Sequence, residues 1–369
     1  MRLVSINNCE SGMVLAKPIY NEDARLLLNV GTTLTEAHIN RIKKRIAFIY
    51  IKSEMTDDII QVNDDIPYEL RTKTIASISN VFSTIRNKPT NKVAITNRLS
   101  NFRSLKETFS NVVHELQRSS DHLNLISHLQ INNDSMFEHS LNTSLYSLSI
   151  GRILGIPEKS LHILGLGALF HDIGKLQLPK SLLSKTDLTD EEKQVKRSHT
   201  EIGFEMLRKE SELHLLVAHC AYQHHENVDG SGYPRGLKKN EIHQFARIIT
   251  VAEKFDQLIR EKAMLPHEAM EVLYGYCYIR YDIEIIDAFK KAVAIFPIGV
   301  TVTLSTGEQG VVIGYNQAYP QRPKVRIFRG KDGKKLSISE FYDIDLLTDL
   351  TTMIVKCDAI IERKTKVIK

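Results

Sequence analysis

The feature that most constrains the fold is a series of histidines and carboxylates spaced at long, regular intervals through the middle of the chain. Successive groups are 25 to 32 residues apart, and they are His139, His171-Asp172, His199, His224-His225 and Glu253. An interval of this length matches one helix and one loop, so each donor can return to the same end of a helical bundle. We therefore expect a bundle in which these side chains converge.

Imidazole nitrogens and carboxylate oxygens are the donors that hold divalent cations in hydrolytic enzymes. Because a carboxylate has two oxygens, it can bridge two ions about 3.5 to 4 Å apart, and Asp172 is our candidate for that role. A lone histidine on an amphipathic helix is usually an ordinary core or surface residue. The histidines that we leave out of the site on this ground are His114, His122, His128, His162, His214 and His219.

Composition narrows the class of protein without naming a function. The chain has 369 residues, of which 42% are hydrophobic and 25% charged, as in globular proteins. Its 49 basic and 44 acidic residues nearly balance, which gives no reason to expect a nucleic-acid polymer as partner. Four cysteines without a CxxC pair suit free thiols in a reducing compartment. Without a signal-peptide pattern or an apolar run long enough to cross a membrane, the sequence predicts a cytoplasmic protein with no membrane partner.

The two segments before the bundle differ in pattern. Residues 1–60 combine short β-like runs at 12–19, 26–28 and 48–51 with a helix signalled by Thr35-Glu36, which predicts a small α/β module. Acidic residues before Pro67 mark a boundary. Residues 66–130 are helical in pattern, with a break near Pro89. The stretch 95–129 could pair with a second copy in a homodimer, although packing on its own domain is the commoner outcome.

Residues 131–295 have the pattern of the bundle itself, and Thr189-Asp190-Glu191-Glu192 fits a capping box that begins one of its helices. After Phe296-Pro297 the apolar residues recur with period two. This change predicts a small all-β, barrel-like domain over 296–352. A basic tail is expected over 353–369.

The motifs of the bundle resemble those of the HD-GYP family, a branch of the HD metal-dependent phosphohydrolases, over about residues 131–262. His171-Asp172 looks like the pair that gives the family the first half of its name, and Gly232-Tyr233-Pro234 looks like the second half. The resemblance implies a mainly α fold, with a central HD-type helical bundle flanked by the α/β module and the barrel-like domain. It also implies a bacterial protein of signal transduction.

The resemblance implies a set of site residues. His139, His171, Asp172 and Glu253 would hold one metal, and His199, His224 and His225 the second. Asp172 and Lys175 would be catalytic, with Lys175 stabilising charge on the phosphoryl group, although it could also be a helix-end surface lysine. The substrate-binding candidates are Lys175, Asp229, Gly232, Tyr233, Pro234, Asp256 and Lys262. For Tyr233 a stable turn, and for Asp256 a solvated helix face, are open alternatives.

Three positions depart from the family pattern. Glu253 stands where the family usually has aspartate, so its ligand geometry is open. Ser135 replaces a glutamate of the trinuclear subgroup, which predicts two metals rather than three. Glu261-Lys262-Ala263-Met264 replaces an aspartate-arginine-proline-tyrosine stretch that contacts substrate, keeping one cation at Lys262.

By resemblance, the reaction is hydrolysis of cyclic di-GMP to the linear dinucleotide pGpG, and to GMP if a second hydrolysis follows. Two divalent ions per chain are implied, and the family favours iron or manganese. Two alternatives stay open. The chain could be a degenerate receptor that binds nucleotide without turnover, or an HD hydrolase of another cyclic dinucleotide.

Overall fold

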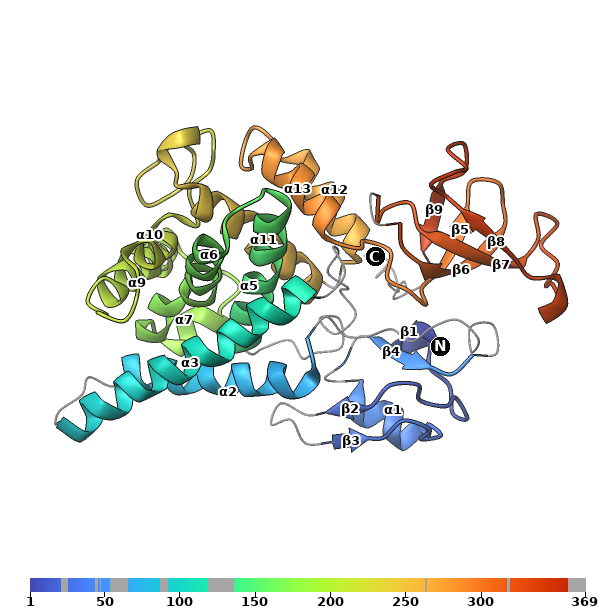
Figure 1. Cartoon of the computed structure of the whole chain (residues 1–369), viewed down its shortest axis with the longest axis horizontal. Coiled ribbons are helices and arrows are strands. Elements are labelled where there is room, and N and C mark those ends of the chain that lie inside the picture. Colours follow the sequence, from blue (N-terminus) through green and yellow to red (C-terminus); the bar gives the residue numbers. More distant parts are fainter. Residues whose placement is uncertain are drawn as a thin grey trace.

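A helical bundle forms one end of the molecule, and a small α/β module and a β-sheet domain lie together at the other (Figure 1). The computed structural model describes residues 1–20, 26–43, 46, 48–53, 66–86, 92–118, 136–262, 264–316 and 319–357, with side chains described for all of these except 20 and 92–95. The described part is mainly helical, as the sequence predicts. None of its helices is long and apolar enough to cross a bilayer.

The α/β module has two short antiparallel strand pairs and one helix. Strand β1 (Arg2–Ser5) pairs with β4 (Phe48–Ile51), and β2 (Ile19–Tyr20) pairs with β3 (Leu26–Leu28). Helix α1 (Glu36–Ile42) begins where predicted, because the Thr35 hydroxyl accepts a hydrogen bond from the His38 amide at 3.2 Å. The expected β-run at 12–19 is largely wrong. Val14 and Leu15 make isolated bridges rather than a continuous ladder, so only Ile19 enters a strand.

Helices α2 (Tyr68–Arg86) and α3 (Lys92–Arg118) pack side by side on the bundle. Their apolar residues enter its core: Phe82 stacks on Phe170 at 5.6 Å between ring centroids, and Phe102 lies 6.2 Å from the same ring. The described apolar face of α3 is therefore covered by its own domain, the commoner of the two outcomes foreseen. Residues 119–135, which include the end of the stretch 95–129 and Ser135, lie outside the described residues.

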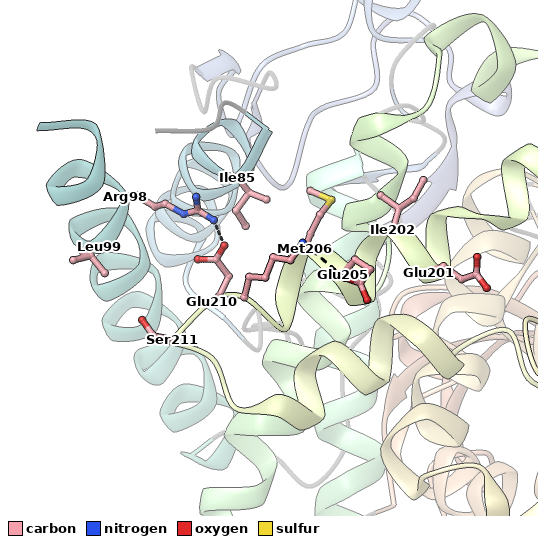
Figure 2. Close-up of a pocket in the computed structure, with 10 residues that line it drawn as sticks. Ile85, Arg98, Leu99, Glu201, Ile202, Glu205, Met206, Glu210 and Ser211 are labelled. Atoms are coloured by element: carbon pink, nitrogen blue, oxygen red, sulfur yellow. Dashed lines mark ion pairs between the residues drawn. The ribbon is translucent and has the colours of Figure 1, made fainter. Parts of the chain in front are cut away.

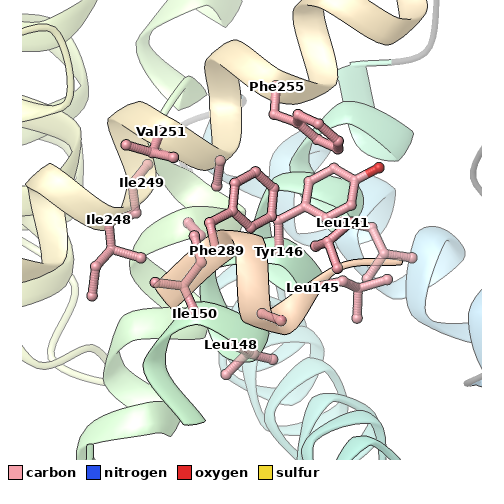
Figure 3. Packing of buried hydrophobic residues seen from close by; sticks show 14 of the residues in the cluster. Leu141, Leu145, Tyr146, Leu148, Ile150, Ile248, Ile249, Val251, Phe255 and Phe289 are labelled. Carbon is pink, nitrogen blue, oxygen red and sulfur yellow. The ribbon is translucent and has the colours of Figure 1, made fainter. Parts of the chain in front are cut away.

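The bundle proper has nine described α-helices between residues 136 and 292, and Thr189 and Glu192 form the predicted capping box before α8. At its centre α5 packs against α11, and Tyr146, Phe255 and Phe289 make edge-to-face contacts at 4.7 to 5.9 Å (Figure 3). Its helices are α5 (Met136–Ile153), α6 (Glu158–Phe170), α7 (Lys180–Ser184), α8 (Asp190–Arg197), α9 (His199–Leu207), α10 (Leu215–Gln223), α11 (Gln244–Arg260), α12 (Pro266–Gly275) and α13 (Ile283–Ala292). Short 3-10 helices span Ile173–Gln177 and Lys239–Glu241.

The C-terminal domain is a five-stranded antiparallel sheet with the order β8-β7-β6-β5-β9. Its strands are β5 (Thr301–Leu304), β6 (Gln309–Gly314), β7 (Lys324–Arg329), β8 (Tyr342–Asp345) and β9 (Ile354–Cys357). The sheet of described strands is open, and closure into a barrel stays a prediction. Strand β9 corrects the expected tail over 353–369: it pairs with β5, so the sheet extends at least to Cys357.

The α/β module and the C-terminal sheet domain contact each other. The Leu3 amide donates to the Gly299 carbonyl at 2.8 Å, and Arg2 Nε donates to Thr301 Oγ1 at 2.9 Å. Gly299 has a φ of +86° at this contact, a conformation that favours glycine. The segment that leads from the bundle to the sheet is therefore bonded to the first strand of the chain.

Candidate metal centre

The predicted donors come together from five separate parts of the bundle. His139 lies in the first turn of α5, and Glu253 lies in the middle of α11. The other donors stand at helix ends: His171-Asp172 directly after α6, His199 at the start of α9, and His224-His225 directly after α10. Helix ends are well suited to this role, because several chain segments can meet there without burying a whole helix face in polar contacts.

A close backbone approach brings two of these segments together. A Cβ atom on Gly174 would lie only 1.9 Å from the carbonyl oxygen of His199 and 2.7 Å from the amide nitrogen of Gly203. Only glycine fits such a contact, since the neighbouring atoms are backbone and cannot rotate away. The 3-10 helix that follows Asp172 can therefore lie directly on the first turn of α9, which carries His199.

The seven side chains form two groups that share one carboxylate. Atoms of Asp172, His199, His224 and His225 lie within 4.8 Å of one another, as do atoms of His139, His171, Asp172 and Glu253. Within the first group, Asp172 Oδ1 lies 3.4 Å from His199 Nε2 and 3.6 Å from His224 Nε2. In the second, its Oδ2 lies 3.5 Å from His171 Nε2 and 3.7 Å from His139 Nε2. Each oxygen thus faces one group, as a bridging carboxylate requires.

Hydrogen bonds on the outer side of the rings fix which nitrogens face the centre. Nδ1 of His171, His199 and His224 lies 2.7, 2.7 and 2.9 Å from the carbonyl oxygens of Ala168, Lys196 and Ala221, respectively. A carbonyl only accepts, so each Nδ1 carries the proton and each Nε2 presents a lone pair to the centre.

Two observations show that this centre fits cations. His199 Nε2 and His224 Nε2 face each other at 3.3 Å, and two lone pairs at that separation repel unless positive charge lies between them. In addition, His171 Nε2 and Asp172 Oδ1 are buried and have no hydrogen-bond partner among the described residues. Buried polar atoms are nearly always satisfied by protein, water or an ion. The donor set, all imidazole and carboxylate, suits divalent ions such as iron, manganese or zinc.

Burial and charge keep His199, His224 and Asp172 in their ligating forms. Burial lowers the pKa of His199 to about 4 and that of His224 to about 3, so both imidazoles are neutral near pH 7. Burial alone would raise the pKa of Asp172, but the Lys175 ammonium and the His171 ring hold it well below its usual range. Burial raises the pKa of Glu253. A nearby cation would favour the ionised form of that carboxylate.

Comparison with known proteins agrees with this geometry. Residues 124–285 match the family model described as HD domain. The chain carries an HD domain. Residues 301–366 match a second model, a KOW domain associated with HD domain, over the C-terminal sheet. The resemblance to the HD-GYP family is confirmed, and an HD domain implies a divalent-metal site.

The curated relatives are cyclic dinucleotide phosphodiesterases by name. A cyclic di-GMP phosphodiesterase of Pseudomonas aeruginosa is 31% identical over 54% of this chain and 49% of its own length. One of Thermotoga maritima is 35% identical over 42% of this chain and 43% of its own length. A 3'3'-cGAMP-specific phosphodiesterase of Vibrio cholerae is 36% identical over 43% of this chain and 35% of its own length. The chain thus spans about half the length of these relatives or less.

Among solved structures, an HDG"Y"P protein from Bdellovibrio bacteriovorus superposes with a TM-score of 0.47 at 17% identity, covering 78% of this chain and 97% of that one.

Two further predicted residues adjoin the HD-domain cluster. Lys175 Nζ lies 2.5 Å from Asp172 Oδ2, and Asp172 and Glu253 together raise the pKa of this lysine although burial opposes them. Asp256 is buried, so the alternative of a solvated helix face is wrong. Its Oδ2 accepts from His139 Nδ1 at 2.6 Å. The structure thus places Asp256 behind a donor, where it holds the His139 ring.

The Gly232-Tyr233-Pro234 loop lies directly against the cluster. The ring of Tyr233 stacks on His225 with 4.7 Å between ring centroids, and the Arg197 guanidinium lies over the Tyr233 ring at 5.0 Å from its centroid. Gly232 is required by shape, because a Cβ there would lie 2.3 Å from the Asn227 amide nitrogen. Pro234 follows Tyr233 in a cis peptide.

Asp229 and Lys262, the two exposed substrate-binding candidates, are not among the seven clustered donors. Both side chains are exposed, and Asp229 Oδ1 accepts from the Ser231 amide at 2.9 Å, as in a turn. Lys262 lies just beyond the end of α11. Roles for either residue in substrate binding stay predictions.

Several residues that hold the site were missed by sequence reasoning. The buried Glu226 carboxylate shapes the Gly232 loop by accepting from the amides of Arg235 at 2.8 Å and Leu237 at 2.9 Å. Thr250 Oγ1 donates to the His224 carbonyl at 2.7 Å. Asn142 Nδ2 donates to Asp256 Oδ1 at 3.0 Å. The only signal for Asn142 was its place one helical turn after His139 on the same face.

A separate cavity of about 600 Å³ lies between α3 and α9 (Figure 2). Its walls are largely apolar, with Leu99, Ile202 and Met206, and an ion pair joins Arg98 to Glu210. None of the seven cluster residues lines it. This cavity is therefore separate from the candidate metal centre.

Proposed function

We propose that the HD domain is a two-metal phosphodiesterase whose substrate is cyclic di-GMP. The observation that carries the proposal is the pair of four-donor groups joined by the two oxygens of Asp172. In this assignment His139, His171, Asp172 and Glu253 hold one ion. His199, His224 and His225 hold the second together with Asp172.

Two bound divalent ions would supply Lewis-acid chemistry, lowering the pKa of a water molecule and neutralising charge on the phosphodiester oxygens. The residues of the chain do the rest. Lys175, kept charged beside Asp172, stabilises the negative charge that develops on the phosphoryl oxygens. Asp256 holds the His139 ring so that Nε2 faces the centre. Tyr233, in contact with both His225 and Arg197, borders the space where a guanine would bind.

The geometry also supports Glu253 as a donor despite its extra methylene. Its carboxylate reaches the group that contains His139 and His171, and its Oε2 lies 3.9 Å from His225 Nδ1. Among divalent ions, iron or manganese is our expectation from the family resemblance. The donor chemistry would also accept zinc, nickel or cobalt.

The substrate assignment rests on the relatives. Cyclic di-GMP phosphodiesterases of Pseudomonas aeruginosa and Thermotoga maritima share the matched region, which favours cyclic di-GMP and the product pGpG. The Vibrio cholerae relatives named as 3'3'-cGAMP-specific favour a second candidate, hydrolysis of a mixed cyclic dinucleotide. A receptor without turnover is less well supported, because all seven donor positions are filled and converge.

The test is hydrolysis of cyclic di-GMP and of 3'3'-cGAMP by anaerobically prepared protein supplied with Fe²⁺ or Mn²⁺, followed by chromatography. Product from cyclic di-GMP alone supports the proposal, and product from 3'3'-cGAMP alone supports the second candidate. Nucleotide binding in calorimetry without product would establish a receptor.

The variant Asp172→Asn keeps the shape of the bridging side chain but removes its charge. It should lose both metal and activity. His114→Ala is the matched control, because His114 is an exposed histidine of α3 outside the cluster. Wild-type protein that retains no metal after anaerobic preparation would contradict the two-metal assignment.

A further inference from the structure

Behind His139 lies a chain of buried hydrogen bonds that reaches a helix outside the HD family match. Asp256 Oδ2 accepts from His139 Nδ1 at 2.6 Å, and its Oδ1 accepts from Asn142 Nδ2 at 3.0 Å. Asn142 Oδ1 in turn accepts from Arg71 Nη2 at 2.6 Å. Arg71 belongs to α2, whereas the HD match covers 124–285.

We infer that Arg71 is a positioning residue for His139, acting through Asn142 and Asp256. A guanidinium only donates, so the side-chain oxygen of Asn142 must face Arg71. The amide NH₂ of Asn142 then faces Asp256, where it is the donor that the carboxylate needs. Without Arg71, the Asn142 oxygen would be a buried acceptor that has lost this donor, so the amide would shift or turn to find another and would loosen its bond to Asp256.

Because these three side chains are buried, each of them loses stability if it loses its hydrogen-bond partner. Arg71 is 3% exposed, Asn142 and Asp256 are each 1% exposed, and a buried acceptor without a donor costs about 1 to 3 kcal/mol. The carboxylate also lies 3.4 Å from Arg260 Nε, one turn along α11. If the Asn142 amide turned away, Asp256 would move toward Arg260 and its bond to His139 would lengthen.

Aromatic side chains pack closely beside this chain of hydrogen bonds. Asn142 lies one turn before Tyr146 on α5, and the Tyr146 ring packs edge-to-face against Phe255 of α11 and Phe289 of α13 (Figure 3). Helix α2 contacts α5 in the same region. The helix that follows the α/β module is thus linked to His139 through two intervening side chains, Asn142 and Asp256.

This inference rests on the proposed function for its effect on metal, but its first test needs no metal. We would label histidine with ¹⁵N in metal-free protein and follow the Nδ1–H proton of His139, assigned with a His139→Gln variant. A short bond to a carboxylate gives a downfield, slowly exchanging proton. In Arg71→Met this signal should move upfield or vanish through exchange.

Controls are built into the same spectrum. The Nδ1–H signals of His171, His199 and His224, which bond to backbone carbonyls, should not change. Lys73→Met removes a charge from an exposed position on the same turn of α2, and it should leave all four signals unchanged. If Arg71→Met does not fold, Asn142→Leu breaks the relay at its next link and should give the same shift.

The second readout is Mn²⁺ titration, followed by the electron spin resonance of free Mn²⁺. Loss of an orienting partner of a ligand costs about 10- to 100-fold in metal affinity. Because Asp256 itself is retained, Arg71→Met should weaken binding of one of the two ions by up to that factor and change the other by less than about threefold, since only one group contains His139.

An unchanged His139 signal in Arg71→Met and in Asn142→Leu would overturn the inference. Absence of Mn²⁺ binding by the wild type would instead contradict the proposed function. The positioning role of Arg71 would still be tested by the His139 signal of the metal-free protein.

Discussion

The contact at Gly174 offers a sharp test of how the two halves of the site are held together. In Gly174→Ala the new Cβ would lie 1.9 Å from the His199 carbonyl oxygen, whereas carbon and oxygen atoms normally stay about 3.3 Å apart or more. The backbone must therefore open by about 1.4 Å, the difference between these distances. This shift would separate Asp172 from His199, whose nearest atoms are now 3.4 Å apart.

Overpacking of this kind costs about 1 to 3 kcal/mol, and a backbone neighbour places Gly174→Ala at the upper end. The lower entropy of the unfolded alanine chain returns up to about 1 kcal/mol, which leaves a loss of about 2 kcal/mol. For a domain of this size that corresponds to a melting temperature lower by about 4 to 8 °C. Metal content should fall as well, because the shared carboxylate moves away from one donor group.

Gly203→Ala is the matched control on the other side of the same contact. A Cβ there would meet the Ala221 Cβ at 3.4 Å, an ordinary contact, and alanine in a helix is about 1 kcal/mol better than glycine. Its melting temperature should be unchanged or higher, with wild-type metal content. Scanning calorimetry and metal analysis of both variants decide the matter. A Gly174→Ala variant that has the same melting temperature as Gly203→Ala and the metal content of the wild type would refute this role of Gly174.

Three other predictions concern the charges and caps of the domain. Burial holds the pKa of His199 at about 4 and that of His224 at about 3, below about 6.5 in the unfolded chain. The unfolded state therefore takes up protons first, and metal-free protein should lose about 2 to 4 kcal/mol of stability as the pH falls from 7 to 5. The raised pKa of His171 offsets part of this loss, whereas the lowered pKa of His225, caused by burial, adds to it. Urea denaturation at several pH values would measure this loss. A free energy of unfolding that does not change between pH 7 and 5 would contradict the lowered pKa values of these histidines. Lys175→Gln should lower kcat at least about 100-fold with metal content unchanged, if its charge acts on the transition state; a change in metal content alone would give it a structural role instead. Thr189→Ala removes the capping box of α8 and should cost about 1 kcal/mol in thermal stability without changing activity.

Much of the candidate site could be predicted because its signal is local. The donor types at His171-Asp172 and His224-His225 can be identified from the chain alone, and so can their return at intervals of one helix and one loop. The cap at Thr189 is also local, since its partner is three residues away. The end of the C-terminal sheet was harder to place, because β9 is defined by its pairing with β5 some fifty residues earlier.

The sequence by itself determined which side chains could bind metal and the approximate intervals between them along the chain. The family resemblance implied their division into two groups that share Asp172, and only the tertiary structure decided which partners orient the donor side chains. Arg71 and Asn142 have no local pattern that marks them, because their role depends on a contact between α2, α5 and α11. Spacing along one helix is fixed by its geometry, whereas the contact between helices is fixed by the packing of every side chain between them.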